Sequence, residues 1–113
     1  MKGEYENMKK LVNLLEKLEY QCLQGTMDKE ITDITFDSRK AEKGCLFFCI
    51  KGAVSDGHTY AKEVAEKGAA VLIVQDKVEV PEEVTVIQVE NSRYAMACIS
   101  AAWFGHPAEK LKP

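Results

Sequence analysis

The sequence predicts a small α/β domain with a mixed, largely parallel sheet and helices on its faces. Three short runs are strongly apolar, at 45–50, 70–74 and 84–89, as expected for strands inside a sheet that is covered on both sides. Apolar residues recur at helical spacing within 59–67 and 91–104. Strands that alternate with helices favour parallel pairing, so this order of elements predicts the fold class.

The first third of the chain predicts one helix and two strands. Residues 7–18 are typical of an amphipathic helix, with leucines at helical spacing and Asn7 as the cap, after a loose tail at 1–6. Residues 20–23 suit a short edge strand that ends at Gly25. Residues 31–37 alternate, with Ile34 and Phe36 on one face, and predict a half-covered strand. A charged turn at 38–44 follows.

The rest of the chain alternates strands with helices. The strand at 45–50 presents apolar residues on both faces, and a glycine-flanked loop at 51–57 precedes a helix at 59–67. Gly68 suits the end of that helix. Strands at 70–74 and 84–89 flank a polar connection. Asn91 or Ser92 caps a last helix that reaches Phe104, and its expected core residues are Ala95, Cys98, Ile99 and Ala102.

Length and composition indicate a single domain. The chain has 113 residues, of which 46% are hydrophobic and 29% charged, enough to bury a core and stay soluble. No run approaches the ~20 apolar residues of a membrane span, and the polar start is unlike a signal peptide. A cytoplasmic location is therefore the expectation. The net charge of −3 gives no general attraction to nucleic acid or an anionic membrane, so any phosphate binding must be local.

The four cysteines are expected to be buried and structural rather than bonded. Cys45 and Cys49 lie on one predicted strand, where ~3.3 Å per residue separates their Cα atoms by about 13 Å, too far for a disulfide. Cys22 and Cys98 have no C-x-x-C partner. The cysteines and the two histidines, His58 and His106, show no metal-ligand spacing.

Polar groups that suit an anionic ligand cluster at the end of the strand at 31–37. Ser38 can contact a phosphate or stabilise the turn, and its spacing alone favours the turn. Arg39 can pair with a diphosphate or with a nearby carboxylate, and the carboxylate is favoured. Asp37 is expected to hold the turn through its own acceptor bonds. Phe36 is either a core residue or a cover for an aromatic base.

The glycine-flanked loop at 52–57 is a second candidate for ligand contact. Its backbone can approach a ligand closely and offer amide groups to a diphosphate. His58 follows it and has no positioned partner for acid–base catalysis, so it is expected to support the loop or cap the helix. The sequence has no G-x-x-x-x-G-K-[ST] phosphate loop and no convincing nucleophile–base pair. This chain alone is therefore expected to be catalytically inactive.

These motifs resemble one family over nearly the whole chain. The runs Asp37-Ser38-Arg39, 43–47, 50–52 and Asp56-Gly57-His58 resemble the N-terminal domain of the Mur ligases, the ATP-dependent amide-forming ligases of peptidoglycan precursor synthesis. The segment at 103–107 with Lys110 and Leu111 is similar to the members that add a diamino acid, diaminopimelate or lysine, to UDP-N-acetylmuramoyl-L-alanyl-D-glutamate.

The resemblance implies a role for residues 1–113 as the domain that binds the UDP portion of this substrate. It implies substrate contacts at Ser38 and Phe36 and at the loop residues Ala53, Val54 and Ser55, beside the contact considered for Arg39. Some relatives carry polar side chains where this chain has Ala53 and Val54, so backbone contacts are expected there. ATP and Mg²⁺ are implied for a central domain, which together with a C-terminal domain would be this domain's partner in the same chain.

Three alternatives remain open. The first is the ligase that adds the terminal D-Ala-D-Ala dipeptide, whose first domain shares the Asp-Ser-Arg and Asp-Gly-His features. The segment at 103–111 favours the diamino-acid ligase over it. The second is a non-catalytic interaction module of the same fold, which would bind no uridine nucleotide. The third is a metal or redox module built on the cysteines, which unreactive thiols together with no bound metal would exclude.

Overall fold

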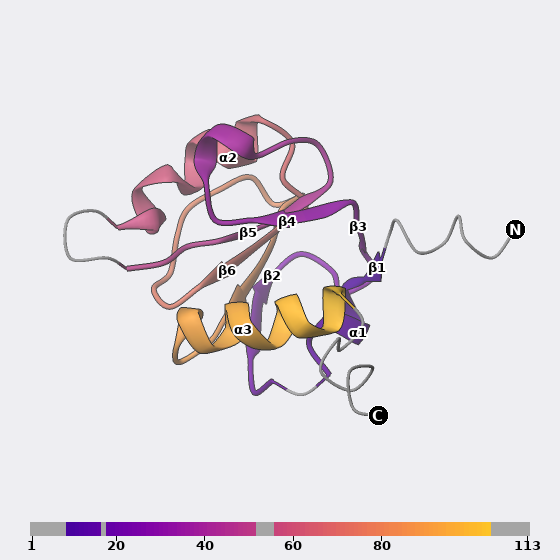
Figure 1. Cartoon of the computed structure of the whole chain (residues 1–113). Helices are drawn as coiled ribbons and strands as arrows, with labels where there is room; N and C mark the ends of the chain where they lie inside the picture. Colours follow the sequence, from indigo (N-terminus) through magenta and orange to yellow (C-terminus); the bar gives the residue numbers. More distant parts are fainter. Residues whose placement is uncertain (1–8, 17, 52–55, 105–113) are drawn as a thin grey trace, which may run out of the picture.

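A computed structural model describes residues 9–16, 18–51 and 56–104, and its centre is a five-stranded sheet (Figure 1). The strands lie in the order β2-β7-β6-β5-β4. Neighbours from β4 to β7 pair in parallel, and β2 pairs antiparallel with β7 at one edge. The prediction of a mixed, largely parallel sheet is confirmed. The strands are β2 (Gln21–Gln24), β4 (Asp33–Thr35), β5 (Cys45–Phe48), β6 (Val71–Val74) and β7 (Thr85–Gln88).

Helices cover both faces of this sheet. The α-helices are α1 (Leu11–Leu14), α2 (Ala61–Glu66) and α3 (Ser92–Trp103), and two 3-10 helices are η2 (Ser38–Lys40) and η3 (Gly57–Tyr60). Leu46 and Phe48 of β5 pack in the cluster that contains α1 and α3. Cys45 and Phe47 pack in the cluster that contains α2. The two-sided burial predicted for the strand at 45–50 is confirmed, because all four residues of β5 are buried.

The predicted helix at 7–18 is only partly correct. Within the described residues, Lys9–Lys10 form a strand, β1, that pairs antiparallel with β3 (Glu30–Ile31). The helix α1 is a single turn, and Leu11 donates its N–H to the Lys29 carbonyl at 2.9 Å. Strand pairing with a distant segment therefore overrides local helical periodicity at the start. Of the four leucines at helical spacing, Leu11, Leu14 and Leu15 are nevertheless buried, and Leu18 is half-buried against the same cluster. The predicted cap Asn7 and the tail lie outside the described residues.

The predicted strand at 31–37 is divided in the structure. Ile31 belongs to β3 and is fully buried, whereas Asp33–Thr35 form the edge strand β4. Thr32 separates the two strands and donates its N–H to the Gly44 carbonyl at 3.0 Å. The alternating segment at 31–37 therefore contributes to two different pairings, β3 with β1 and β4 with β5.

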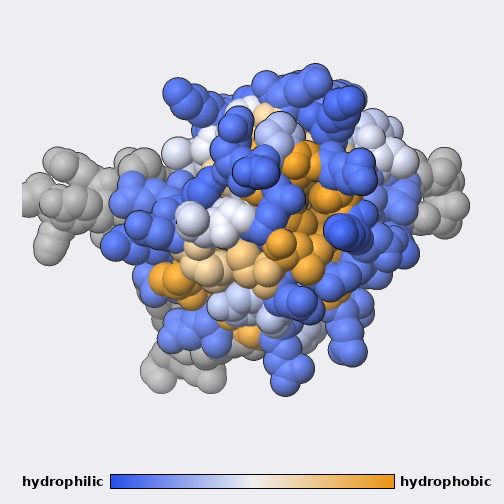
Figure 2. Space-filling model, turned by 180° about the vertical axis from the view of Figure 1, so that it is seen from behind, coloured by the Kyte–Doolittle hydropathy of each residue, from blue (hydrophilic) through white to orange (hydrophobic). Residues whose placement is uncertain are grey.

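The other predicted elements are confirmed with ends shifted by one or two residues. The edge strand before Gly25 is β2, and Asn91 caps α3 by accepting the Tyr94 N–H at 3.0 Å. Figure 2 shows the side opposite to Figure 1, where hydrophilic side chains surround a central hydrophobic cluster. Among the described residues, no helix combines the length and the apolarity needed to span a bilayer.

Candidate functional site

The carboxyl ends of the four parallel strands lie along one edge of the sheet, which we call the carboxyl edge. The strands β4, β5, β6 and β7 end at Thr35, Phe48, Val74 and Gln88. Polar or exposed residues lie within three positions of each end: Phe36, Lys51, Gln75 and Glu90. In open parallel sheets, ligands bind outside the carboxyl ends of the strands. The predicted site segments at 36–39 and 50–58 both start at this edge.

The turn after β4 is held by Asp37. Its carboxylate accepts the Arg39 backbone N–H at 2.9 Å, and the Arg39 Nε and Nη2 each at 3.1 Å. These hydrogen bonds from Arg39 hold the pKa of Asp37 below its ordinary value of 3.8. The turn-stabilising role predicted for Asp37 is therefore confirmed, and so is the carboxylate partner favoured for Arg39. The Arg39 side chain remains 86% exposed.

Phe36 and Ser38 flank Asp37 on the surface. Phe36 is 64% exposed, which contradicts its assignment as a core strand residue. Ser38 begins η2, and its backbone carbonyl accepts the Lys67 Nζ at 2.7 Å. Within the described ranges, the Ser38 hydroxyl has no hydrogen-bond partner. An exposed aromatic ring and a hydroxyl thus stand two residues apart at the carboxyl edge.

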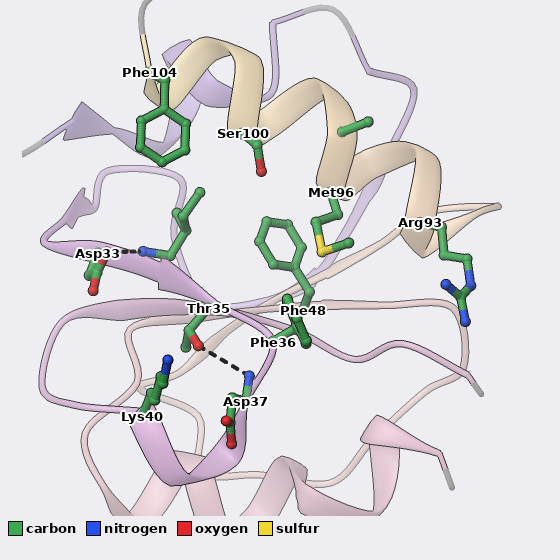
Figure 3. A pocket seen from close by; sticks show the side chains of 12 residues that line it. Asp33, Thr35, Phe36, Asp37, Lys40, Phe48, Arg93, Met96, Ser100 and Phe104 are labelled. Carbon is green, nitrogen blue, oxygen red and sulfur yellow. Dashed lines mark hydrogen bonds between the residues drawn. The ribbon is translucent and has the colours of Figure 1, made fainter. Parts of the chain in front are cut away.

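Two hollows meet at this segment. The first, the β4–α3 groove, has a volume of about 560 Å³ and lies between the end of β4 and α3. Figure 3 shows Met96 and Ser100 of α3 facing Thr35 and Phe36 across it. The second, the β4–η3 hollow, has a volume of about 660 Å³. Its lining is Phe36, Asp37, Ser38, Arg39, Ile50, Gly57, Tyr60 and Glu63. Phe36 and Asp37 line both hollows.

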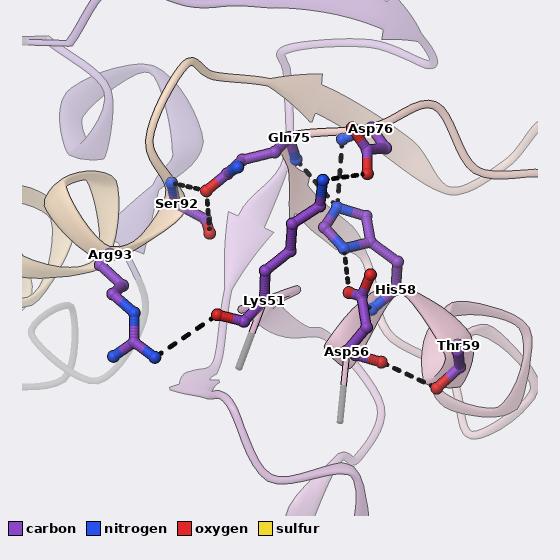
Figure 4. A network of polar contacts seen from close by, with 8 residues as sticks. All are labelled: Lys51, Asp56, His58, Thr59, Gln75, Asp76, Ser92 and Arg93. Carbon is purple, nitrogen blue, oxygen red and sulfur yellow. Dashed lines mark hydrogen bonds and ion pairs between the residues drawn. The ribbon is translucent and has the colours of Figure 1, made fainter. Parts of the chain in front are cut away.

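A polar network joins the segments that follow β5 and β6 (Figure 4). Lys51 and Asp56 form an antiparallel bridge, which brings together the described ends of the loop. Lys51 also pairs with Asp76 at 2.6 Å. His58 Nδ1 lies 2.6 Å from Asp56 Oδ1, and His58 Nε2 accepts the N–H groups of Gln75 and Asp76 at 2.9 and 3.1 Å. The supporting role predicted for His58 is confirmed.

The network continues from β6 to the start of α3. Gln75 Oε1 accepts the backbone N–H and the hydroxyl of buried Ser92, each at 2.8 Å. Arg93 Nη2 donates to the Lys51 carbonyl at 3.4 Å. Sequence reasoning did not single out Gln75, Asp76 or Arg93, because only the fold brings them beside the loop. The predicted contacts Ala53, Val54 and Ser55 lie outside the described residues.

One group of possible metal ligands occurs among the described residues, although spacing alone predicted none. The ligand atoms of Asp56, His58 and Asp76 all lie within 4.8 Å of one another. Both nitrogens of His58 and the Asp76 carboxylate already have protein partners, including Lys51. Hydrogen bonds and ion pairs therefore account for the cluster.

The cysteines differ from one another in exposure. Cys45 and Cys49 are buried, as predicted, and burial raises the pKa of Cys49 to about 12. Cys22 is exposed and Cys98 is half-buried, so the prediction of burial is wrong for Cys22. Cys22 lies in the first half of the edge strand β2, where both residues are exposed.

The lowered pKa values at the carboxyl edge predict acid sensitivity. The pKa values of Asp37 and Asp56 lie below 3.8, chiefly through hydrogen bonds from Arg39 and His58. Their stabilising contribution is therefore complete above pH 3.8 and is lost as the pH falls through the lower folded values. As the pH is lowered through this acid range, we expect the melting temperature of the double variant Asp37→Asn, Asp56→Asn to fall less than that of the unmodified chain. Asparagine keeps the capping acceptor but removes the titration.

The control for this experiment is Asp28→Asn, at an exposed aspartate without an ion pair among the described residues. Its melting temperature should depend on pH as that of the unmodified chain does. Melting curves of the double variant that stay parallel to those of the unmodified chain down to about pH 2 would contradict the assignment.

Comparison with known proteins identifies the family. Residues 30–104 match the model described as "Mur ligase family, catalytic domain". The chain is 41% identical over 102 residues to the UDP-N-acetylmuramoyl-L-alanyl-D-glutamate--2,6-diaminopimelate ligase of Clostridium perfringens, covering 90% of this chain and 21% of that protein. The corresponding ligase of Bacillus licheniformis is 40% identical over 104 residues, covering 91% and 21%.

Solved structures agree with the sequence relatives. A crystal structure of MurF from Acinetobacter baumannii superposes with a TM-score of 0.67 at 27% identity, covering 84% of this chain and 21% of that one. MurF ligase from Thermotoga maritima in complex with ADP gives a TM-score of 0.56 at 25% identity, covering 65% and 17%. The chain spans about a fifth of the length of the curated relatives it matches. Because the family model covers more than half of its residues, the chain belongs to the Mur ligase family.

Proposed function

We propose that this chain is the N-terminal domain of a Mur ligase and that it holds the UDP portion of UDP-N-acetylmuramoyl-L-alanyl-D-glutamate. The observation that carries the proposal is the exposed Phe36 ring beside Ser38 at the carboxyl edge, where two hollows meet. An aromatic ring without a core role is costly to expose and suits a planar partner such as uracil.

The β4–α3 groove suits the base better than it suits a phosphate. Phe48 is 1% exposed and lies among its lining residues, beside Met96 and Ala97 of α3. Sites for small ligands are typically apolar with a few polar groups that fix orientation. We therefore place the uracil ring against Phe36 in this groove.

The diphosphate is placed toward the turn at Ser38. The Ser38 hydroxyl can donate to a phosphate oxygen, and η2 and the loop at 52–57 offer further groups. Arg39 can contact the diphosphate only by sharing its guanidinium with Asp37. Ala53, Val54 and Ser55 remain proposed contacts on the strength of the family resemblance.

The whole protein is proposed to add a diamino acid to the substrate in the cytoplasm, during peptidoglycan precursor synthesis. The named acceptor of the curated relatives, 2,6-diaminopimelate, favours that amino acid over lysine. This chain would contribute positioning, because binding energy from the distant nucleotide orients the reacting carboxylate.

ATP and Mg²⁺ do not fit the residues present here. The sequence has no phosphate loop, and the carboxylates of Asp56 and Asp76 are paired with His58 and Lys51. No step of the reaction is therefore assigned to residues of this chain. We place the ATP site in a central domain, and we expect the chain alone to be inactive.

A second candidate is the ligase that adds the D-alanyl-D-alanine dipeptide. Several structural neighbours are MurF proteins, including one named as the D-alanyl-D-alanyl ligase of Acinetobacter baumannii. The curated relatives, at 41% and 40% identity, favour the diaminopimelate ligase over it.

The proposal predicts that Phe36→Ala weakens nucleotide binding without unfolding the chain. Loss of one stacked base contact should lower affinity about tenfold. Binding is measured by NMR titration of the labelled chain with UDP-N-acetylmuramoyl-L-alanyl-D-glutamate and with UDP. Ser38→Ala is titrated in parallel, and it should weaken binding with little change in melting temperature. Shifts in the unmodified chain should centre on Ser38 and the segment 52–57.

The matched control is Tyr94→Ala, because Tyr94 is 61% exposed on α3 and lines neither hollow. It should bind as the unmodified chain does. Equal affinity of all three variants would exclude Phe36 and Ser38 as contacts. If about 1 mM ligand caused no chemical-shift changes, that result would count against nucleotide binding by this chain, because binding with a Kd of about 1 mM is already weak. The absence of chemical-shift changes is the result expected of an interaction module that binds no nucleotide.

A further inference from the structure

His58 is a largely enclosed side chain at the carboxyl edge, and its contacts determine which ring nitrogen carries the proton. Its side chain is 9% exposed. Nε2 faces two backbone N–H groups, those of Gln75 and Asp76, at 2.9 and 3.1 Å. A backbone N–H can only donate, so Nε2 must accept and the ring proton must lie on Nδ1. Nδ1 then donates to Asp56 Oδ1 at 2.6 Å.

Through these bonds, one side chain joins three segments of the chain. Asp56 closes the bridge with Lys51 at the end of β5, and Gln75 and Asp76 follow β6. The same Asp56 oxygen also accepts the His58 backbone N–H at 2.9 Å, which fixes the start of η3. The position of η3 relative to the sheet therefore depends on the imidazole ring (Figure 4).

The segment that His58 fixes forms a wall of the β4–η3 hollow. Gly57 and Tyr60 of η3 line that hollow together with Ile50. Gly57 donates its N–H to the Ile50 carbonyl at 2.8 Å, and a Cβ on Gly57 would lie 2.7 Å from the Ile50 nitrogen. The backbones are so close that a small shift of η3 must change the hollow.

We infer that His58 is a positioning residue for nucleotide binding, acting as the neutral Nδ1–H tautomer to hold η3 against the turn after β6. The inference rests on the proposed function, since the ligand is the UDP portion of the substrate. His58 itself lies behind the wall and does not touch the ligand. Its contribution is to keep Gly57 and Tyr60 where the ligand requires them.

The groups that face the ring favour the Nδ1–H tautomer. The titratable groups of the described residues that face the ring are Asp56, Asp76 and Lys51, with the buried thiol of Cys49 near Asp56. Hydrogen bonds from His58 keep the pKa of Asp56 below 3.8, so this carboxylate stays ionised in mild acid. A proton on Nε2 would instead point at two N–H donors, so both acceptor bonds depend on the Nδ1–H tautomer.

The test compares His58→Asn with His58→Gln. Glutamine is long enough to place a carbonyl oxygen near the position of Nε2, whereas asparagine reaches only the position of Nδ1. We expect His58→Asn to lower affinity for UDP-N-acetylmuramoyl-L-alanyl-D-glutamate about tenfold, because two enclosed N–H groups lose their acceptor. His58→Gln should stay within about threefold of the unmodified chain. Thermal unfolding of both variants shows that each is folded at the titration temperature.

The ring tautomer and the rescue by His58→Gln separate positioning from simple structural support. Ring ¹⁵N spectra, assigned with His106→Gln, should show the Nδ1–H tautomer.

Each contrary result has its own meaning. An Nε2–H tautomer, or equal binding by His58→Asn and the unmodified chain, would overturn the inference while leaving the proposed function intact. An Nδ1–H tautomer in a chain that binds no nucleotide would overturn the proposed function and the inference together, because the positioned ligand would not exist.

Discussion

Replacement of Phe47 by alanine should lower the free energy of unfolding by about 3–5 kcal/mol. Phe47 is fully buried in the middle of β5, in the cluster that joins the sheet to α2. Its removal exposes apolar surface and leaves a cavity that strands paired on both sides cannot close. At about 4 °C per kcal/mol, the melting temperature should fall by roughly 12–20 °C.

Phe36→Ala is the matched control, since it is the same substitution at an exposed site. Phe36 is 64% exposed, and its replacement should change stability by no more than about 0.5 kcal/mol. Urea denaturation of both variants measures the difference. Similar losses of stability would mean that the cluster under α2 is not packed as the structure has it.

Replacement of Gly25 by alanine should cost roughly 3 kcal/mol, from left-handed backbone strain of ~1–2 kcal/mol and from overpacking of ~1–3 kcal/mol. Gly25 has a φ of +83°. An added Cβ would lie 2.5 Å from Thr85 Oγ1 and 2.6 Å from Thr85 Cα. Thr85 cannot move aside, because it is buried in β7 and its hydroxyl bonds both the N–H and the carbonyl of Thr26.

Gly68→Ala separates the backbone strain from the overpacking. Gly68 has a φ of +103°, but the nearest atoms to an added Cβ belong to Lys43 and lie at 3.0 to 3.4 Å. It should therefore cost mainly the backbone strain of ~1–2 kcal/mol. Chemical denaturation that ranks Gly68→Ala as the more damaging change would contradict the contact between Gly25 and β7.

The local patterns identified most elements because local chemistry and tertiary packing agree there. The runs at 45–50, 70–74 and 84–89 became buried parallel strands, and Asn91 caps α3 as its residue type predicts. The segment at 7–18 shows where the two disagree. Leu11, Leu14 and Leu15 are spaced for a helix and are buried, yet Lys9–Lys10 pair with Glu30–Ile31 as strands. Helical periodicity identifies which residues are buried but not the backbone that buries them.

The turns of the site could be predicted from the sequence, but the contacts between its segments could not. Asp37 and Asp56 both precede 3-10 helices and accept the N–H two residues later, which is what an aspartate in that position does. Alternation along 31–37 does not predict the exposure of Phe36, because it assigns a residue to a face of the strand without showing whether that face is covered. The edge position of β4 leaves that ring at the surface between two hollows.

The sequence by itself determined the α/β class, the buried strands, the turn chemistry and the motifs that resemble the Mur ligases, because these depend on neighbours within a few residues. Only the tertiary structure decided which strand ends meet. It placed Gln75 and Asp76 against His58, and Arg93 against Lys51, across separations of 17, 18 and 42 residues. Such contacts form when parallel strands align their carboxyl ends, and no local pattern specifies that alignment.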